Sequence, residues 1–426
     1  MRKQAASFRL RLGRLCALAL LALASAGAIP HAALAEVEVV KGPYIVADVA
    51  SGAVFEHHDA LRPWYPASTT KMMTAYVTFR AVAAGEVTLQ SPVVISGKAA
   101  AQPPSKMGFT PGAVLTVDNA LKIIMVKSAN DIALALAEAV GGSEEGFAAR
   151  MNAEARRLGM GRSHFVNPHG LPDPRQVTTA RDMALLARAL LVEFAEHRSY
   201  YNIPAIQFGN NVMKNYNALV SRYPGTTGMK TGYICSSGFN LVASARRGNK
   251  EVVAVVFGAY SGRDRAERAA ALLDEGFRSG GLFGRARINL ANVSSGIGFR
   301  EPLDMRPVIC TEKRKEVMEE IAEEPQFKTL PNGVVVRMRG AQPPTTALGP
   351  PRDMGPPVRV ALGGAAAEPE IASAPLPRIR PRRAELPEPP GMAAAFAASP
   401  VIPAAAVTDA AIRGDGVPLP RPRPER

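Results

Sequence analysis

The sequence predicts an α+β fold for residues 36–283, with one antiparallel sheet flanked by helices. Strand patterns occur near the start of this region and again near its end, and helical patterns fill the middle. We therefore expect both ends of the domain to supply strands to the same sheet. The hydrophobic content of 47% over 426 residues is sufficient for a sizeable core.

The outer strands are predicted first. Residues 44–49 are rich in strand-forming types, and Ser51-Gly52 supplies a turn, so 43–55 is interpreted as a hairpin. At the other end of the domain, 238–245 and 251–258 flank the polar segment 246–250, which is typical of a strand, a turn and a strand.

Helical periodicity fills the region between these strands. Apolar residues recur at helical spacing and predict helices over five segments: 69–83, 118–125, 131–140, 180–194 and 263–277.

The first 35 residues have the pattern of a secretory signal peptide. Basic residues precede an apolar run from Leu15 to Ile29, and Ala33-Leu34-Ala35 forms a small-residue cleavage site. A membrane anchor is the alternative, but the apolar run is shorter than the roughly 20 residues of a spanning helix. We expect cleavage after Ala35 and export to the periplasm or cell envelope.

Two cysteines remain after the predicted cleavage, Cys235 and Cys310. An oxidising compartment would permit a disulfide between them. Two separate buried thiols are the alternative, and the sequence alone leaves both open.

The C-terminal part is predicted to differ from the folded domain. Residues 341–426 are rich in Pro, Ala, Gly and Arg, have no periodicity, and are interpreted as a disordered tail. Residues 284–340 form a small appendage of uncertain structure, with a charged helix at 311–323 and a strand at 334–338.

The formal net charge of +14 is partly carried by arginines of this tail. Because an exported protein meets little nucleic acid, we expect no nucleic-acid partner. An electrostatic contact of the tail with the anionic wall or membrane surface is the preferred interpretation, and it would make the protein peripheral on the membrane.

Ser68 and Lys71 lie three positions apart at the start of the predicted helix 69–83. This spacing places both on one helix face, where a lysine can activate a serine hydroxyl near the positive helix end. Alone the pattern is weak, because a serine before a helix is usually an N-cap.

Two further elements follow in the chain. Ser128-Ala129-Asn130 lies between two predicted helices, and Lys230-Thr231-Gly232 precedes the strands at 238–258. Each has an ordinary alternative: a cap or turn for the first, and a solvated lysine beside a turn for the second. Gly232 would let another backbone approach closely, and Lys230 with Thr231 could hold a carboxylate.

Together the three elements are far more specific. S-x-x-K, S-D-N and K-T-G form the signature of penicillin-binding proteins and class A β-lactamases, here in that order with Ala129 in the middle position. The blocks 66–75, 127–131 and 228–233 resemble those of the serine-type D-alanyl-D-alanine carboxypeptidases, the low-molecular-mass penicillin-binding protein family. The loop 167–173 is also similar, although we assign no catalytic role to its His169. The resemblance covers roughly residues 40–280.

The resemblance implies a DD-peptidase/β-lactamase-like fold and a hydrolase of cell-wall biosynthesis. Such an enzyme removes the terminal D-alanine from peptidoglycan pentapeptides through an acyl-enzyme and is acylated by β-lactam antibiotics. Ser68 would be the nucleophile, Lys71 the base, and Ser128 a proton relay.

The same resemblance implies the substrate-binding residues. Asn130 would orient Lys71 and the substrate amide, and Lys230 and Thr231 would bind the terminal carboxylate. Gly232 is also assigned to the substrate-binding residues. The backbone N–H groups of Ser68 and Tyr233 would form the oxyanion hole.

Three alternatives stay open. A β-lactamase shares the motifs, but class A enzymes also need a deacylating glutamate for which we find no convincing equivalent near 167–173. A DD-endopeptidase of the same family is the second, and an inactive wall-binding module is the third.

We expect no cofactor and no metal, since the six histidines show no metal-binding spacing. A second β-rich domain and an amphipathic membrane helix, which many relatives carry, are not evident in residues 284–426.

Overall fold

The computed structural model describes residues 42–279, 288–294, 298, 301–310, 327–329, 335–337 and 348–363. The predicted signal peptide, the predicted helix at 311–323 and most of the predicted disordered tail lie outside the described residues. Within the described ranges, no helix is long and apolar enough to cross a membrane.

The centre of the domain is a five-stranded sheet with the order β2-β1-β9-β8-β7. Its strands are β1 (Tyr44–Asp48), β2 (Val54–His58), β7 (Thr226–Ile234), β8 (Gly238–Arg247) and β9 (Lys250–Ala259). All neighbours are antiparallel, and β1 pairs with β9 at Tyr44 and Val256. The prediction that both ends of the domain contribute to one sheet is confirmed.

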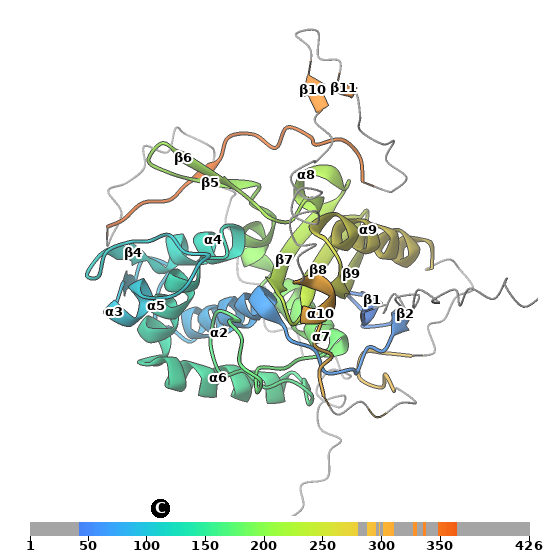
Figure 1. Cartoon of the computed structure of the whole chain (residues 1–426), viewed down its shortest axis with the longest axis horizontal. Coiled ribbons are helices and arrows are strands. Elements are labelled where there is room, and N and C mark those ends of the chain that lie inside the picture. Colours follow the sequence, from blue (N-terminus) through green and yellow to red (C-terminus); the bar gives the residue numbers. More distant parts are fainter. Residues whose placement is uncertain are drawn as a thin grey trace, which may run out of the picture. The chain divides into compact units, whose positions relative to one another are not determined.

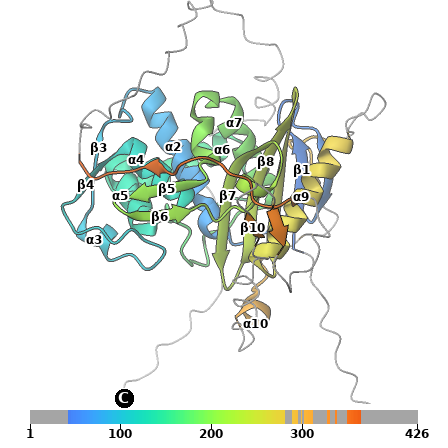
Figure 2. The same ribbon diagram turned by 90° about the horizontal axis from the view of Figure 1, so that it is seen from above.

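Two helices pack on this sheet. Helix α9 (Gly262–Arg278) contacts β8 and β9, and α7 (Ala180–Val192) contacts β1 and β9. Figure 2 shows them on opposite sides of the strands. Close packing requires a glycine at position 276, because a Cβ there would lie 2.5 Å from a methyl carbon of Val252.

A second group of helices lies beside the sheet (Figure 1). It contains α2 (Lys71–Ala83), α4 (Val117–Val126), α5 (Asn130–Gly141) and α6 (Glu144–Arg157), with the short α3 (Gly97–Ala100) and the hairpin of β3 (Pro92–Val94) and β4 (Val114–Thr116). Helix α2 is buried along most of its length, so it passes through the core and fixes the residues at its N-terminus.

The sequence analysis did not predict helix α6. A signal was available, because Phe147, Met151 and Ala155 recur every four residues and are all buried. Ser143 caps this helix by accepting a hydrogen bond from the backbone N–H of Gly146 at 3.0 Å.

The remaining elements lie between α7 and β7 or after α9. They are η2 (Ala195–Asn202), β5 (Ala205–Phe208), β6 (Asn211–Lys214), α8 (Leu219–Arg222), α10 (Arg306–Ile309), β10 (Phe327–Thr329), β11 (Val335–Arg337) and β12 (Val358–Arg359). Strands β10 and β11 pair with each other, so a strand does occur at the predicted 334–338.

The expectation of disorder needs one correction. Residues 348–363 fall inside the predicted tail, yet β12 pairs with β5 in parallel, with Val358 opposite Ile206. Leu348 and Val360 are buried. The stretch is too poor in apolar residues to fold alone, but it is stabilised by pairing with a strand edge that the domain already provides.

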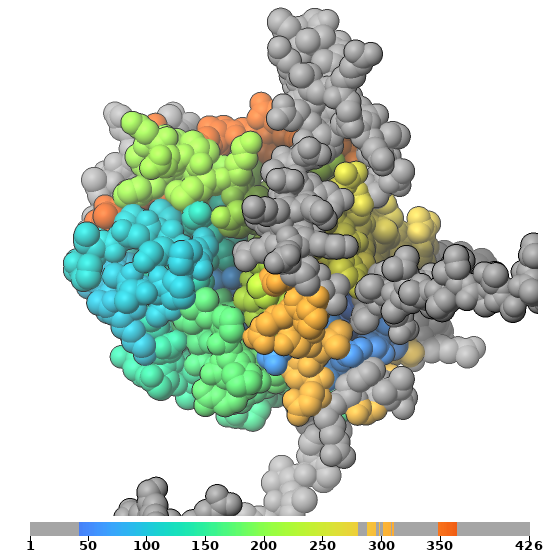
Figure 3. Space-filling model, viewed as in Figure 1, coloured from blue at the N-terminus to red at the C-terminus, as the bar shows by residue number. Residues whose placement is uncertain are grey.

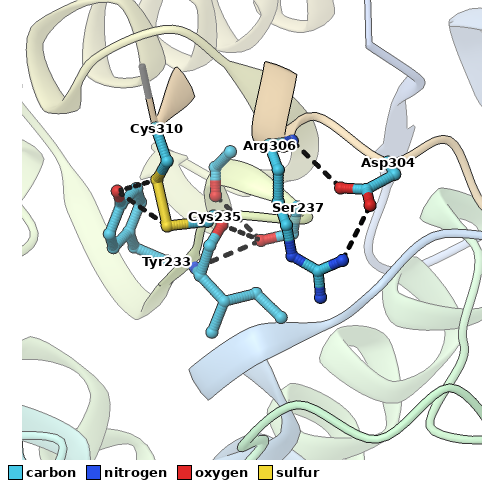
Figure 4. Close-up of a disulfide and its surroundings, with 8 residues drawn as sticks. Tyr233, Cys235, Ser237, Asp304, Arg306 and Cys310 are labelled. Atoms are coloured by element: carbon cyan, nitrogen blue, oxygen red, sulfur yellow. Dashed lines mark hydrogen bonds and ion pairs between the residues drawn. A yellow bond between two sulfur atoms is a disulfide. The ribbon is translucent and has the colours of Figure 1, made fainter. Parts of the chain in front are cut away.

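Cys235 and Cys310 form a disulfide, with an S–S distance of 2.06 Å (Figure 4). This settles the alternative left open by the sequence. The bond joins α10 to the turn between β7 and β8, where Met305 N–H also donates to the Ser236 carbonyl.

Candidate active site

Ser68 lies in a short 3-10 turn, η1 (Ala67–Thr70), immediately before α2. Ala67 adopts a positive φ of 48°, and the turn packs against Gly170, where a Cβ would lie 1.8 Å from the Ala67 carbonyl oxygen. Gly170 itself has a φ of +85°. The loop predicted at 167–173 therefore supports the turn that carries Ser68.

Lys71 is fully buried, and three acceptors surround its ammonium nitrogen. Its Nζ lies 3.1 Å from Ser68 Oγ, 2.8 Å from Asn130 Oδ1 and 2.7 Å from the His169 carbonyl oxygen. Burial lowers the pKa of Lys71 well below its ordinary value, and the charge of Lys230 lowers it further, while Asp131 acts in the opposite direction.

Lys230 is the second buried lysine. Its Nζ lies 3.0 Å from Ser128 Oγ and 2.9 Å from the Thr231 carbonyl oxygen. Burial and then the charge of Arg265 lower its pKa to about 7. Ser128 has a positive φ of 61°, a conformation that is uncommon for residues other than glycine.

Asn130 is the first residue of α5, and its side chain bridges two parts of the site. While Oδ1 accepts from Lys71, its Nδ2 donates to the Pro103 carbonyl at 2.9 Å. The neighbouring Asp131 accepts from the backbone N–H groups of Met107 and Gly108 and so holds the adjacent loop. Both contacts restrict the position of Asn130, whose Oδ1 accepts the hydrogen bond from Lys71.

Strand β7 carries the third motif against the Ser68 turn. A Cβ at Gly232 would lie 3.0 Å from the backbone nitrogens of both Ser68 and Thr69, so only a glycine permits this approach. Tyr233 packs on Phe239 with ring centroids 4.3 Å apart, and its hydroxyl lies 3.3 Å from Cys310 Sγ. Figure 4 shows Tyr233 beside the disulfide.

A cleft with a volume of about 820 Å³ opens over these residues. Six of the eight predicted site residues line it: Ser68, Ser128, Asn130, Thr231, Gly232 and Tyr233. The other two, Lys71 and Lys230, lie beneath it and bond to lining hydroxyls. The sequence-predicted site residues are thus brought together in one place.

The charged residues that line the cleft are all of the same sign. Five cationic residues line it and, among the described lining residues, there is no Asp or Glu; the cations are Lys214, Arg222, Arg263, Arg265 and Arg352. Such a cleft favours an anionic ligand. The described residues contain no cluster of His, Cys, Asp and Glu suited to a metal ion.

The sequence analysis missed Arg265. This residue of α9 is 8% exposed, and its guanidinium donates to the carbonyls of Tyr216 and Asn240 at 3.2 and 3.5 Å. Its Nε is buried without a hydrogen-bond partner in the part of the chain described here. Burial lowers its pKa to about 10, so the group stays cationic at neutral pH. The sequence alone does not distinguish Arg265 from the other arginines of this charged helix.

His169 contributes its backbone rather than its ring. The carbonyl accepts from Lys71, whereas the Nδ1 atom accepts from the Leu171 N–H at 3.2 Å. Burial lowers the pKa of the imidazole to about 3, so the ring is neutral at physiological pH.

Comparison with known proteins gives a consistent result. Residues 30–261 match the peptidase S11 family, described as D-alanyl-D-alanine carboxypeptidase. The carboxypeptidase DacC of Escherichia coli is 37% identical over 242 residues, which are 55% of this chain and 60% of that protein. DacF of Bacillus subtilis is 32% identical over 289 residues, or 65% of this chain and 74% of that protein.

Among solved structures, penicillin binding protein 5 from Haemophilus influenzae is 32% identical and superposes with a TM-score of 0.54. The similarity covers 56% of this chain and 71% of that one. The chain spans 60% of the length of DacC.

Proposed function

Because the chain belongs to the D-alanyl-D-alanine carboxypeptidase family, we propose that it removes the terminal D-alanine from peptidoglycan stem peptides through an acyl-enzyme on Ser68. The observation that carries the proposal is the contact of Lys71 Nζ with Ser68 Oγ at 3.1 Å, combined with a lysine pKa lowered well below its ordinary value. Without such a base a serine hydroxyl is a poor nucleophile.

The acylation step follows from this geometry. Neutral Lys71 accepts the hydroxyl proton as Ser68 Oγ bonds to the carbonyl carbon between the two D-alanines. The oxyanion is stabilised by the backbone N–H groups of Ser68 and Tyr233. Collapse breaks the peptide bond, and the proton that Lys71 took from Ser68 passes through Ser128 to the amine of the leaving D-alanine, so Lys71 becomes neutral again. Ser128 also contacts Lys230 at 3.0 Å.

Deacylation restores the enzyme. Water gives one proton to Lys71 and attacks the ester carbonyl, and the bond to Ser68 Oγ breaks with return of a proton to that oxygen. The products are free D-alanine and a peptide shortened by one residue.

Recognition of a chain end is assigned to the cationic part of the cleft. Thr231 lies on its wall, protonated Lys230 lies directly behind it, and the guanidinium of Arg265 adds a second buried positive charge. A carboxylate placed here receives charge-assisted hydrogen bonds, which are about twice as strong as neutral ones. This favours substrates whose last residue has a free carboxylate.

Penicillins are proposed as inhibitors rather than substrates. The solved relative from Haemophilus influenzae is a penicillin binding protein. No carboxylate is present among the described residues that line the cleft, so the glutamate that activates the deacylating water in class A β-lactamases has no counterpart there. The penicilloyl ester on Ser68 is therefore expected to persist.

The periplasm or cell envelope is the proposed location. It is supported by the proposed action on peptidoglycan and by the signal-peptide pattern of residues 1–35. An electrostatic contact of the tail arginines with the wall or membrane surface is part of this proposal.

The proposal is tested by D-alanine release from a peptide that ends in D-Ala-D-Ala. We expect release by the wild-type protein and its loss in Ser68→Ala. Ser199→Ala is the matched control, since Ser199 is exposed on η2 and does not line the cleft. Equal release by the wild type and Ser68→Ala would contradict the assignment of the nucleophile.

A further inference from the structure

Residues 348–363, here called the strap, run along one side of the cleft. In Figure 1 the strap is the orange-red trace that passes over β5 and α8, and Figure 3 shows it beside the green surface of the same region. Nothing in the family comparison includes it, because the family match ends at residue 261.

The first half of the strap is bound to α8 by backbone groups. The Gly349 N–H donates to the Arg222 carbonyl at 3.0 Å, and Arg222 Nε donates back to the Gly349 carbonyl at 2.9 Å. The Arg352 N–H donates to the Ser221 carbonyl at 2.9 Å, and its Nη2 donates to the Tyr223 carbonyl at 2.8 Å. Leu348 is 2% exposed. These reciprocal contacts fix the segment to the domain.

The second half is held by the β5 edge and by α4. Beyond the pairing of β12 with β5, the Val360 N–H donates to the Gln207 carbonyl at 2.9 Å. Asn119 Nδ2 donates to the Ala361 carbonyl at 3.1 Å. The strap is thus attached at both of its ends.

Four strap residues line the cleft directly: Leu348, Pro351, Arg352 and Met354. They belong to the first half, next to α8. The strap is therefore one wall of the same cleft into which Ser68 opens.

The position of this wall follows from the direction of β7. The scissile carbonyl is assigned to Ser68 and the Tyr233 N–H, and the terminal carboxylate to Lys230 and Thr231, which are nearer the start of the strand. Continuing in that direction, β7 begins at Thr226, just after Tyr223, whose carbonyl accepts from Arg352. On this assignment of the substrate, the strap lies beyond the terminal carboxylate, on the side of the leaving group.

Arg265 supports the same placement. Its Nη2 donates to the Tyr216 carbonyl in the loop that leads into α8, to which the strap is bound. The proposed carboxylate site and the strap wall are thus connected through one short segment of chain.

We propose that the strap limits the size of the leaving group and so makes the protein a carboxypeptidase rather than an endopeptidase. This inference rests on the proposed function of the site. A single D-alanine ends at the carboxylate site. In a cross-linked substrate the residue that accepts the D-alanyl bond carries a second stem peptide, which must continue past that site into the volume bounded by the strap.

The test compares two activities of the full-length mature chain. One is D-alanine release from a peptide ending in D-Ala-D-Ala, and the other is hydrolysis of a cross-linked stem-peptide dimer. The first variant replaces residues 348–354 by a Gly/Ser segment of equal length. The second, Pro351→Gly with Met354→Gly, keeps the buried Leu348 and all of the backbone contacts that involve Gly349 and Arg352.

We expect the ratio of dimer hydrolysis to D-alanine release to rise about tenfold or more in both variants, which is the order of discrimination that an apolar pocket achieves for one methylene group of a substrate. Arg359→Ala is the matched control, because Arg359 is an exposed strap residue that does not line the cleft, and its ratio should equal that of the wild type.

Labelling by a fluorescent penicillin reports whether the site is intact. It therefore separates a failure of the hypothesis on the strap from a failure of the proposed function. An unchanged ratio in a variant that labels like the wild type would overturn the role of the strap. If the Gly/Ser replacement of residues 348–354 abolishes labelling, the role of the strap is tested with the variant Pro351→Gly with Met354→Gly alone. Absence of labelling and of D-alanine release in the wild type itself would instead reject the proposed function.

Discussion

Lys71 Nζ lies 3.1 Å from the Oγ of Ser68, which belongs to η1, whereas Lys71 is the first residue of the following helix α2. The lysine reaches this position with no exposed surface, so its neutral form is favoured by desolvation. Lys230 adds to the effect through its charge. We assign the two lysines different roles: neutral Lys71 is the base, and protonated Lys230 attracts the substrate carboxylate.

The first prediction concerns the pH dependence of kcat/KM for a D-Ala-D-Ala peptide. Activity should rise with pH as Lys71 becomes neutral and then fall as pH passes about 7, where Lys230 loses the proton that attracts the carboxylate. Steady-state rates between pH 5 and about 9 measure the profile. A rate that keeps rising through this range would contradict the role of protonated Lys230.

The second prediction concerns Arg265. Its positive charge lowers the pKa of Lys230, so Arg265→Gln should raise that pKa and shift the falling limb of the profile to higher pH. The same variant should raise KM, because one carboxylate partner is lost, and decrease kcat/KM by roughly 10- to 100-fold. Arg268→Gln, which changes a partly exposed arginine paired with Asp264, is the control and should leave the profile in place. An unchanged pH profile in Arg265→Gln would contradict the effect of the Arg265 charge on the pKa of Lys230.

The third prediction concerns Gly232. A methyl group at this position would press on the nitrogens of Ser68 and Thr69 and displace the turn from β7. Gly232→Ala should therefore lower kcat/KM by about 100-fold, the effect of a misplacement near 1 Å, while thermal unfolding changes less. Gly161→Ala is the matched control, since a Cβ there has no neighbour within 4 Å. Wild-type kinetics in Gly232→Ala would show that the close approach is not needed.

Much of the site was predictable because its residues occur in three short motifs with fixed order. The pairing of β1 with β9 was also predictable, since strand patterns stood at both ends of the domain. Arg265 could not be recognised, because its importance comes from burial beside Lys230, and no local pattern separates it from Arg263 or Arg268. The strap was missed for a related reason: residues 348–363 have no periodicity, and their order depends on the edge of β5.

The fourth prediction concerns the disulfide. Cys235 and Cys310 are 75 residues apart in sequence. In the chain-entropy description, closing a loop of this length restricts the unfolded state by about 4 kcal/mol. We expect Cys235→Ser with Cys310→Ser to lower the free energy of unfolding by a few kcal/mol, measured by denaturant titration. Reducing agent should destabilise the wild type similarly and leave the double variant unchanged; an equal effect on both would contradict the assignment.

The central claim is that Ser68 is the acylated residue, and the most direct measurement is mass spectrometry of the mature protein after incubation with a penicillin. Digestion and peptide mapping locate the adduct. The account predicts one penicilloyl group per chain, on the peptide that contains Ser68, and no adduct in Ser68→Ala. An adduct on another residue, or equal labelling of Ser68→Ala, would contradict it.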